Sequence, residues 1–135
     1  IELNGFADDG RSTCVAANAM DYIKELADKK ASFDIVVLDP PSFAKTKEQA
    51  EAAISGFRHL MINGIKVTKP GGLIALFSCS YHVGMDELIE LSLGASRDTG
   101  KQLKVLEHLY QDKDHPYVLN MPNSLYLKGL LFQVM

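Results

Sequence analysis

This sequence has few cysteines, no long hydrophobic run and no large excess of charge. Its 135 residues include two cysteines, Cys14 and Cys79, whose positions do not match a metal-binding motif. Two cysteines without a secretion signal favour a reducing compartment, so we expect a cytoplasmic protein. No run approaches the roughly 18 apolar residues of a helix that spans a membrane. The net charge of −3 gives no indication of a surface that coats nucleic acid, although a local basic strip can lie on an acidic domain.

The sequence also lacks internal repeats, low-complexity segments and an interdomain linker. A chain of 135 residues suffices for one domain with a packed core and is too short for two. It begins at Ile1, without methionine, in what resembles the end of a helix that Gly5 would cap in the left-handed conformation. We therefore expect residues 1–135 to be part of a longer protein.

The most informative stretch is the apolar run at residues 35–38, together with the Asp39-Pro40-Pro41 turn that follows it. Four consecutive aliphatic residues predict a strand that is buried on both faces, as in a parallel sheet. Each proline fixes its own φ and restricts the residue before it, so the chain should leave the sheet extended. Ligands bind at the carboxyl ends of strands in open α/β sheets, which makes Asp39 a candidate site residue. On its own, Asp-Pro can also be a simple strand terminator.

Hydrophobic patterning along the chain predicts alternating strands and helices. We expect helices at residues 20–28, 50–65 and 85–98, because each segment has apolar residues spaced three or four apart. Strands are expected at residues 13–17, 35–38, 73–77, 103–110 and 125–134. This order predicts an α/β fold with a mostly parallel sheet, right-handed helical crossovers and a C-terminal antiparallel hairpin.

Cys79 lies between Ser78 and Ser80, directly after the apolar run at residues 73–77. That strand would present the thiol at the same edge of the sheet as Asp39. A thiol and a carboxylate that face one crevice suit nucleophilic catalysis. A buried structural cysteine is the alternative, because free cysteines are commonly buried. Cys14 lies inside the expected strand at residues 13–17, and we interpret it as a core residue.

Several motifs occur in order across nearly the whole chain. They are Asn-Ala-Met-Asp-Tyr at residues 18–22, Asp-Pro-Pro-Ser-Phe-Ala at 39–44, Lys-Pro-Gly-Gly at 69–72, Ser-Cys-Ser at 78–80, Asp-His-Pro at 114–116 and Ser-Leu-Tyr-Leu-Lys-Gly-Leu at 124–130. Together they resemble the motifs of bacterial 23S ribosomal RNA large-subunit methyltransferases that make 5-methylcytosine. Those enzymes belong to the class I methyltransferases, which use S-adenosylmethionine and have a Rossmann-like fold. The combination is much more specific than Asp-Pro-Pro alone.

The resemblance implies a reaction and a role for individual residues. The Cys79 thiolate would attack C6 of a cytosine in ribosomal RNA, and Asp39 would hydrogen-bond the base and stabilise the adduct. The base must first be unstacked into the pocket. The residues implied in binding S-adenosylmethionine are Asn18, Ala19, Met20, Asp39 and Pro40. Those implied in binding RNA are Pro41, Phe43, Lys45, Ser80 and His115.

Some of these residues fit other roles equally well. Phe43 could stack on the target base, as aromatic residues do in single-strand binders, or it could pack within its loop. Lys45 could contact a phosphate, and His115 could support the site, but both also fit a solvated loop. The chain has Asn18 and Met20 where the family usually has Asp and Phe. An asparagine carbonyl can still accept a hydrogen bond from the adenine amino group.

The sequence contains neither a Gly-x-Gly loop after a first strand nor the acidic residue that would hold the ribose. The resemblance places both upstream of Ile1, together with the first strands of the sheet and a small RNA-binding domain. It therefore implies that residues 1–135 are the C-terminal portion of a methyltransferase catalytic domain. In such a truncated sheet the strand at residues 35–38 would lose a neighbour. We expect its free edge to be covered by the 13–17 strand or by a second copy of the chain, as a homo-oligomer.

Two other functions fit the sequence. A methyltransferase for a base nitrogen would also use an Asp-Pro-Pro-aromatic motif but would need no cysteine, so Cys79 discriminates between the two chemistries. A noncatalytic α/β module would leave both Asp39 and Cys79 without a chemical role. A glycine-rich loop upstream of this chain would argue against that module.

Overall fold

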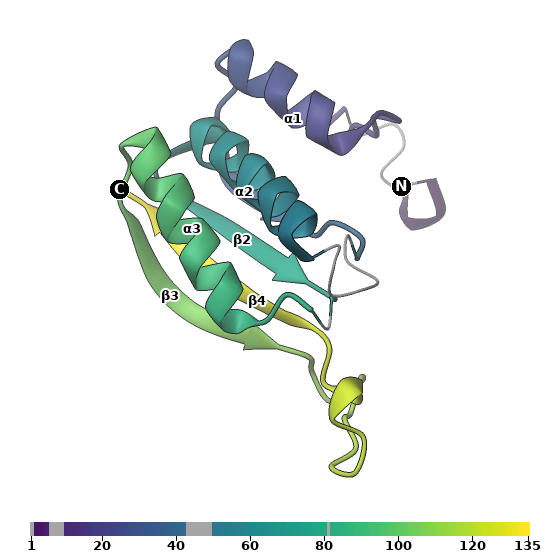
Figure 1. The fold of residues 1–135 in the computed structure, drawn as a ribbon. Helices are drawn as coiled ribbons and strands as arrows, with labels where there is room; N and C mark the ends of the chain where they lie inside the picture. Colours follow the sequence, from purple (N-terminus) through teal and green to yellow (C-terminus); the bar gives the residue numbers. More distant parts are fainter. Residues whose placement is uncertain (1, 6–9, 43–49, 81) are drawn as a thin grey trace.

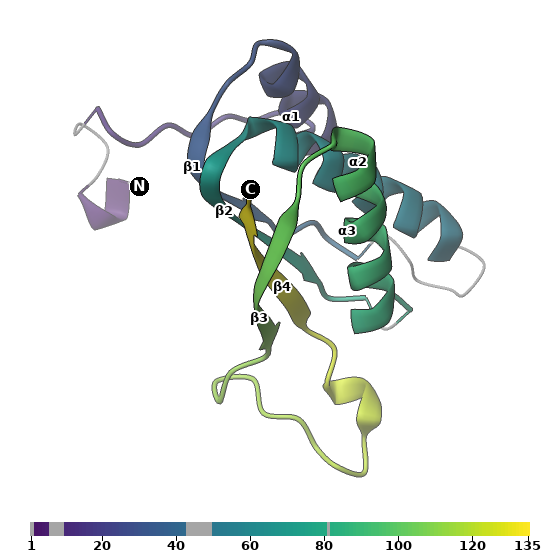
Figure 2. The ribbon, with the colours of Figure 1, turned by 90° about the vertical axis from the view of Figure 1, so that its left-hand side faces the viewer.

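Four strands form one sheet, and three helices pack against it, in a computed structural model that describes residues 2–5, 10–42, 50–80 and 82–135. The strands are β1 (Phe33–Leu38), β2 (Thr68–Ser78), β3 (Leu103–Tyr110) and β4 (Lys128–Val134). The helices are α1 (Ala19–Asp28), α2 (Ala50–Val67) and α3 (Met85–Thr99), with short 3-10 turns at Glu2–Asn4 and Pro122–Ser124. All three helices lie on the same face of the sheet (Figures 1 and 2).

The strand order is β1-β2-β4-β3. β1 and β2 are parallel, with Leu38 opposite Leu76, and α2 connects them. β4 runs antiparallel to both of its neighbours, β2 and β3. The predicted α/β fold with a C-terminal antiparallel hairpin is therefore confirmed. Because β3 is parallel to β1 and β2, these three strands end at the same edge of the sheet.

Local sequence signals explain where the helices begin and end. The side chain of Asn18 caps α1, since its Oδ1 accepts a hydrogen bond from the Met20 amide at 2.9 Å. At the start of α3, Glu87 Oε2 accepts a hydrogen bond from the Gly84 amide at 2.9 Å. α3 ends at Gly100, whose φ of 65° is the left-handed cap expected of glycine. The three predicted helices are confirmed.

The core lies between the sheet and α2. Phe57, Met61 and Ile65 are fully buried along α2, and they belong to the same hydrophobic cluster as Ile74 and Leu76 of β2. This spacing of four along α2 is the apolar stripe that predicted the helix. α2 is flanked by α1 on one side and by α3 on the other (Figure 1).

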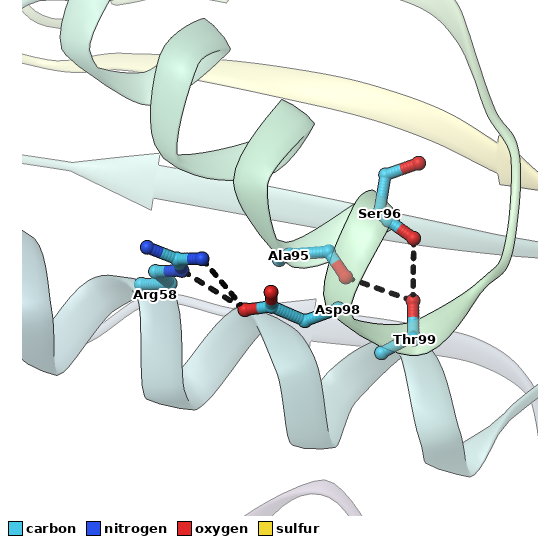
Figure 3. A network of polar contacts seen from close by, with 5 residues as sticks. All are labelled: Arg58, Ala95, Ser96, Asp98 and Thr99. Carbon is cyan, nitrogen blue, oxygen red and sulfur yellow. Dashed lines mark hydrogen bonds and ion pairs between the residues drawn. The ribbon is translucent and has the colours of Figure 1, made fainter.

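A polar contact joins α2 to α3 at the exposed rim of their interface. Asp98 Oδ2 accepts hydrogen bonds from Arg58 Nη2 at 2.8 Å and Nε at 3.1 Å (Figure 3). The next residue, Thr99, donates through Oγ1 to the carbonyl groups of Ala95 and Ser96 at the end of α3. These groups lie on the helical side of the sheet and satisfy each other, so we assign them to helix packing.

Two glycines of α2 provide a matched test of this packing. A Cβ atom at Gly64 would come within 2.8 Å of the buried side chains of Leu38 and Ile74, whereas one at Gly56 would meet nothing within 4 Å. Both alanine substitutions gain the same helix propensity, so the difference between them reports crowding. Urea unfolding should show Gly64→Ala to be less stable than Gly56→Ala by about 1–3 kcal/mol. Equal stabilities would contradict the close approach of α2 to the sheet.

The structure corrects three predictions about the first third of the chain. Residues 13–17 form no strand, and Cys14 is exposed instead of buried in the core. β1 is not buried on both faces: Val36 and Leu38 are buried beneath the helices, whereas Ile35 and Val37 are 63% and 62% exposed. The physical reason is that, among the described elements, all helices lie on one face of the sheet. Among the described residues β1 pairs only with β2, so residues 13–17 do not extend the sheet as a strand at its free edge.

The bounds of the later strands also differ from the prediction. β2 begins at Thr68, so Lys69, Pro70 and the two glycines that follow lie inside a strand and not in a loop. Gly71 has a φ of 82°, which only glycine adopts without strain, and the β1–β2 register shifts beside this segment. β4 begins at Lys128 and not at residue 125, because the amides of Tyr126 and Leu127 donate to the side chain of Gln111 instead of to a strand.

Candidate active site

Asp39 and Cys79 each follow the carboxyl end of a strand, and these strands are neighbours. Asp39 comes one residue after the end of β1, and Cys79 one residue after the end of β2. Because β1 and β2 pair in parallel, both residues lie at the same edge of the sheet. This is the arrangement that the sequence predicted, and it is the edge at which α/β proteins bind ligands.

A cleft of about 510 Å³ opens where β1 ends and α1 begins. Its lining residues are Asn18, Ala19, Met20, Val37, Leu38, Asp39, Pro40, Pro41 and Leu60. All five residues that the sequence associated with a cofactor are in this set, as is Pro41. The cleft has the size of a small-molecule site, with mostly apolar walls and few polar groups.

Three of the residues that line the cleft were not predicted from the sequence. Val37, Leu38 and Leu60 are aliphatic, and their sequence context is that of ordinary core residues. Leu60 belongs to α2 and reaches the cleft only through the packing of that helix. No local signal in the sequence distinguishes these residues from the other aliphatic residues of the strands and helices.

Asn18 has a structural role in addition to lining the cleft. Its Oδ1 accepts hydrogen bonds from the amides of Met20 and Asp21, at 2.9 and 3.4 Å. These bonds use the oxygen that was expected to accept a hydrogen bond from an adenine amino group. The cap also fixes the first turn of α1, and with it the position of Met20 in the wall of the cleft.

The Ser78-Cys79-Ser80 turn is held by its own side chains. Ser78 and Ser80 are buried, and the half-buried Cys79 lies between them. The Ser80 amide donates to Ser78 Oγ at 3.2 Å, and Ser78 Oγ donates to the Val83 carbonyl at 3.4 Å. Cys79 is a free cysteine, and it is not among the residues that line the 510 Å³ cleft. Ser80 was expected to contact RNA, but its burial favours a structural role.

Lys128, the first residue of β4, reaches the same turn. It lies opposite Ser78 in the β2–β4 register, and its Nζ donates to the carbonyl groups of Ser80 and Tyr126. Desolvation by burial lowers the pKa of Lys128, while the nearby Cys79 and Glu87 act to raise it. Lys128 belongs to one of the sequence motifs, but no role was predicted for it. Its contact with Ser80 joins distant parts of the chain and cannot be recognised from local sequence.

The loop between β3 and β4 extends from the same edge of the sheet (Figure 1). Gln111 braces it, since its Nε2 donates to the carbonyls of His115 and Ser124, at 2.7 and 2.9 Å. His115 is exposed, and its Nδ1 lies 3.2 Å from Asp114 Oδ2. Within the described residues no hydrogen bond or ion pair joins His115 to Asp39 or Cys79. Phe43 and Lys45 lie outside the residues that the structure describes.

Two further kinds of feature are absent from the described part of the chain. It contains no group of three or more histidine, cysteine, aspartate or glutamate side chains that could hold a metal ion. None of its helices is both long enough and apolar enough to cross a membrane.

Sequence comparison finds relatives that match the chain from end to end. The Alteromonas mediterranea protein named ribosomal RNA large subunit methyltransferase I is 34% identical over 134 residues, which cover 99% of this chain and 34% of the relative. This chain is similar to a third of a ribosomal RNA methyltransferase. The protein of the same name from Cronobacter sakazakii is 31% identical over 135 residues, 100% of this chain and 34% of the relative. No protein-family model matches the chain.

Structure comparison gives the fold. A candidate S-adenosylmethionine-dependent methyltransferase from Streptococcus mutans superposes with a TM-score of 0.72 and 18% sequence identity, over 97% of this chain and 34% of that one. The four-stranded sheet and its three helices therefore have the α/β fold of class I methyltransferases, as expected from the motifs. As in the sequence comparison, the chain spans about a third of the protein that it matches.

Proposed function

We propose that residues 1–135 are the C-terminal portion of the catalytic domain of an enzyme that methylates C5 of cytosine in ribosomal RNA through an adduct with Cys79. The parallel pairing of β1 and β2 carries the proposal, because it brings Asp39 and Cys79 to one edge of the sheet. The name shared by the relatives supports ribosomal RNA as the substrate and methyl transfer as the reaction. The order of the motifs supports cytosine C5 as the position.

The uncovered face of the sheet supports the view that the domain extends beyond this chain. Ile35 and Val37 are more than half exposed on β1, although both are aliphatic and lie in a run typical of a buried strand. Exposure of such side chains is unfavourable, since burying one stabilises a fold by about 1.5–3 kcal/mol. The relatives are about three times as long as this chain. We propose that further parts of the catalytic domain cover this face.

The cleft beside Asp39 fits part of S-adenosylmethionine. Met20, Pro40 and Leu60 offer apolar surface for the adenine ring, and Asn18, whose oxygen caps α1, offers its side-chain NH2 group as a hydrogen-bond donor. Asp39 presents a carboxylate, which suits a cofactor that carries a positive sulfonium. When bound, this cofactor supplies the methyl group. The expected glycine-rich loop and ribose-binding acid would come from outside this chain.

Cys79 and Asp39 would have separate roles in the reaction. The Cys79 thiolate forms a bond to C6 of the cytosine, and the π-electron pair of the C5–C6 double bond becomes available at C5. Asp39 hydrogen-bonds the polar edge of the base and stabilises the adduct. After methyl transfer, a base removes the proton from C5, the C5–C6 double bond re-forms, and the bond from C6 to sulfur breaks so that the thiolate leaves. The cysteine is thereby regenerated for the next cycle.

Methylation of a base nitrogen is the second candidate. It is favoured by the position of Cys79 outside the cleft that contains Asp39, Pro40 and Pro41. That chemistry would need the carboxylate and the aromatic residue but no thiol. Release of the C5 proton distinguishes the two reactions, because only methylation at C5 removes it.

The test uses ribosomal RNA that carries tritium at C5 of its cytidines, together with the complete protein. Methylation at C5 should release one tritium atom into water for every methyl group transferred, since the C5 proton is lost in each turnover. Cys14→Ala should show the same ratio, because Cys14 is exposed and lies outside the cleft. Methyl transfer without tritium release would contradict the proposal and would favour a base nitrogen.

A further inference from the structure

The side chain of Lys128 crosses from β4 to the turn that contains Cys79. Its Nζ donates one hydrogen bond to the carbonyl of Ser80, 48 positions away in the sequence, and one to the carbonyl of Tyr126 at 3.0 Å. Lys128 is only partly exposed, which is unusual for lysine. A partly desolvated ammonium group needs such partners, so these two bonds fix its position relative to the turn.

The charge of Lys128 lies close to two ionisable groups. A Cys79 thiolate on the turn after β2 and the Glu87 carboxylate on α3 both favour the charged form of Lys128, against the desolvation that lowers its pKa. Lys128 lies opposite Ser78 in the sheet and bonds to the carbonyl of Ser80, so its charged group is anchored to the residues on both sides of Cys79. Glu87 is also held in place, because it accepts the amide of Gly84. The described residues between β2 and α3 include one further titratable side chain besides Cys79, that of His82.

We propose that Lys128 is a positioning residue for Cys79, which holds the backbone of the Ser78-Cys79-Ser80 turn and places a positive charge beside the thiol. This inference rests on the proposed role of Cys79 as a nucleophile and adds a residue to that role. The attacking species in such a reaction is the thiolate, which a neighbouring lysine stabilises. Anchoring Ser80 fixes one end of the turn, while Ser78 is fixed at the end of β2.

A lysine near the end of a strand could instead serve only to hold the Tyr126–Lys128 segment. In that case any side chain that donates to the two carbonyl groups would suffice, and the charge would be irrelevant. Lys128→Gln separates the two roles, because the amide of glutamine still donates hydrogen bonds but carries no charge. Lys128→Arg keeps the charge and the capacity to donate.

The experiment measures alkylation of Cys79 by iodoacetamide in the complete protein, without RNA or cofactor. Peptide mass spectrometry follows each cysteine separately, from about pH 6 to about pH 10, a range that spans the ordinary ionisation of thiols. The exposed Cys14 serves as an internal control for the reagent. At neutral pH, Lys128→Gln should slow alkylation of Cys79 about tenfold, as expected when a nearby unit charge is removed from a half-buried site. The rate at Cys14 should not change.

The pH dependence identifies the effect as electrostatic. The difference between Lys128→Gln and the unmodified protein should close towards the alkaline end, where the thiol ionises without help, and Lys128→Arg should stay within about threefold of the unmodified protein throughout. A His82→Asn variant with an unchanged profile assigns the effect to Lys128. Unfolding of Lys128→Gln would be recognised because Cys79 would then react as fast as Cys14. In that case the inference is tested by the rate of Cys79 alkylation in Lys128→Arg, compared with the rate in the unmodified protein.

Two results would overturn the inference. One is alkylation of Cys79 in Lys128→Gln at the unmodified rate, and the other is a Lys128→Arg rate well below the stated range. Neither result depends on methylation. The proposed function is tested separately by turnover of a Cys79 variant, so the two ideas can fail independently.

Discussion

Replacing Cys79 by alanine is expected to abolish methylation of ribosomal RNA by the complete protein. A covalent nucleophile lowers the barrier of the step in which it takes part, and each 1.4 kcal/mol of barrier corresponds to about a tenfold change in rate. Loss of the thiol should therefore reduce single-turnover methylation by several orders of magnitude. Cys79 is half-buried at the end of a strand, so the same change should cost only about 1 kcal/mol of stability. The rate is measured with transcribed ribosomal RNA and radiolabelled S-adenosylmethionine.

Cys14→Ala is the matched control, since it removes the other thiol of this chain from an exposed position. It should leave the rate unchanged. A Cys79→Ala protein that methylates at about a tenth of the normal rate or better has lost at most 1.4 kcal/mol of transition-state stabilisation. That outcome would show that Cys79 is not the nucleophile. Asp39 would then be the central residue of a nitrogen methyltransferase.

Asp39→Ala is expected to have the second largest effect on the reaction. Asp39 lies at the end of β1 and lines the cleft, so its removal takes away the proposed hydrogen bond to the base and a negative charge beside the cofactor site. Loss of a positioned acid or base group lowers kcat/KM by about 10²–10⁴-fold. Asp39→Asn should retain more activity than Asp39→Ala, because an amide oxygen can still accept a hydrogen bond.

Asp34 provides the control for Asp39, because it lies near the start of β1, whereas Asp39 follows the end of that strand. Its carboxylate pairs with Lys69 at 2.8 Å and is highly exposed. Exposed ion pairs contribute about 0–1 kcal/mol to stability. The Asp34→Ala variant should therefore have nearly the same free energy of unfolding as the unmodified protein and should keep its methylation rate. If Asp34→Ala and Asp39→Ala lose activity to the same extent, the loss would reflect damage to β1 and not the chemistry of Asp39.

The helices of this fold could be predicted from the sequence because each has an apolar stripe that faces a single core. α2 illustrates this, with Phe57, Met61 and Ile65 buried at a spacing of four. The exposure of one face of β1 could not be predicted. Aliphatic residues such as Ile35 and Val37 are typical of a buried strand, and the sequence does not indicate whether another element covers them. Residues 13–17 were predicted as a strand on local composition, but a strand forms only where a partner offers backbone groups.

The candidate site was predictable where it is local and was missed where it is not. Asn18 and Asp39 come from short motifs on either side of one helix, and the fold brings both to the cleft. Leu60 and Lys128 reach the site across long sequence separations, from α2 and β4. Their contribution depends on packing and register, which a single sequence does not specify. Ser80 was predicted to contact RNA because it neighbours Cys79, but it is buried in the turn that follows β2.

The central claim is that Cys79 forms a covalent bond to the target cytosine. It is tested most directly with RNA whose target base is 5-fluorocytosine, because fluorine at C5 blocks the elimination that frees the thiol. The complete protein, supplied with S-adenosylmethionine, should form a complex with this RNA that survives denaturing electrophoresis, and mass spectrometry should locate the bond at Cys79. Cys14→Ala should form the complex and Cys79→Ala should not. A denaturation-resistant complex in Cys79→Ala, or none in the unmodified protein while it methylates normal RNA, would contradict the proposed mechanism.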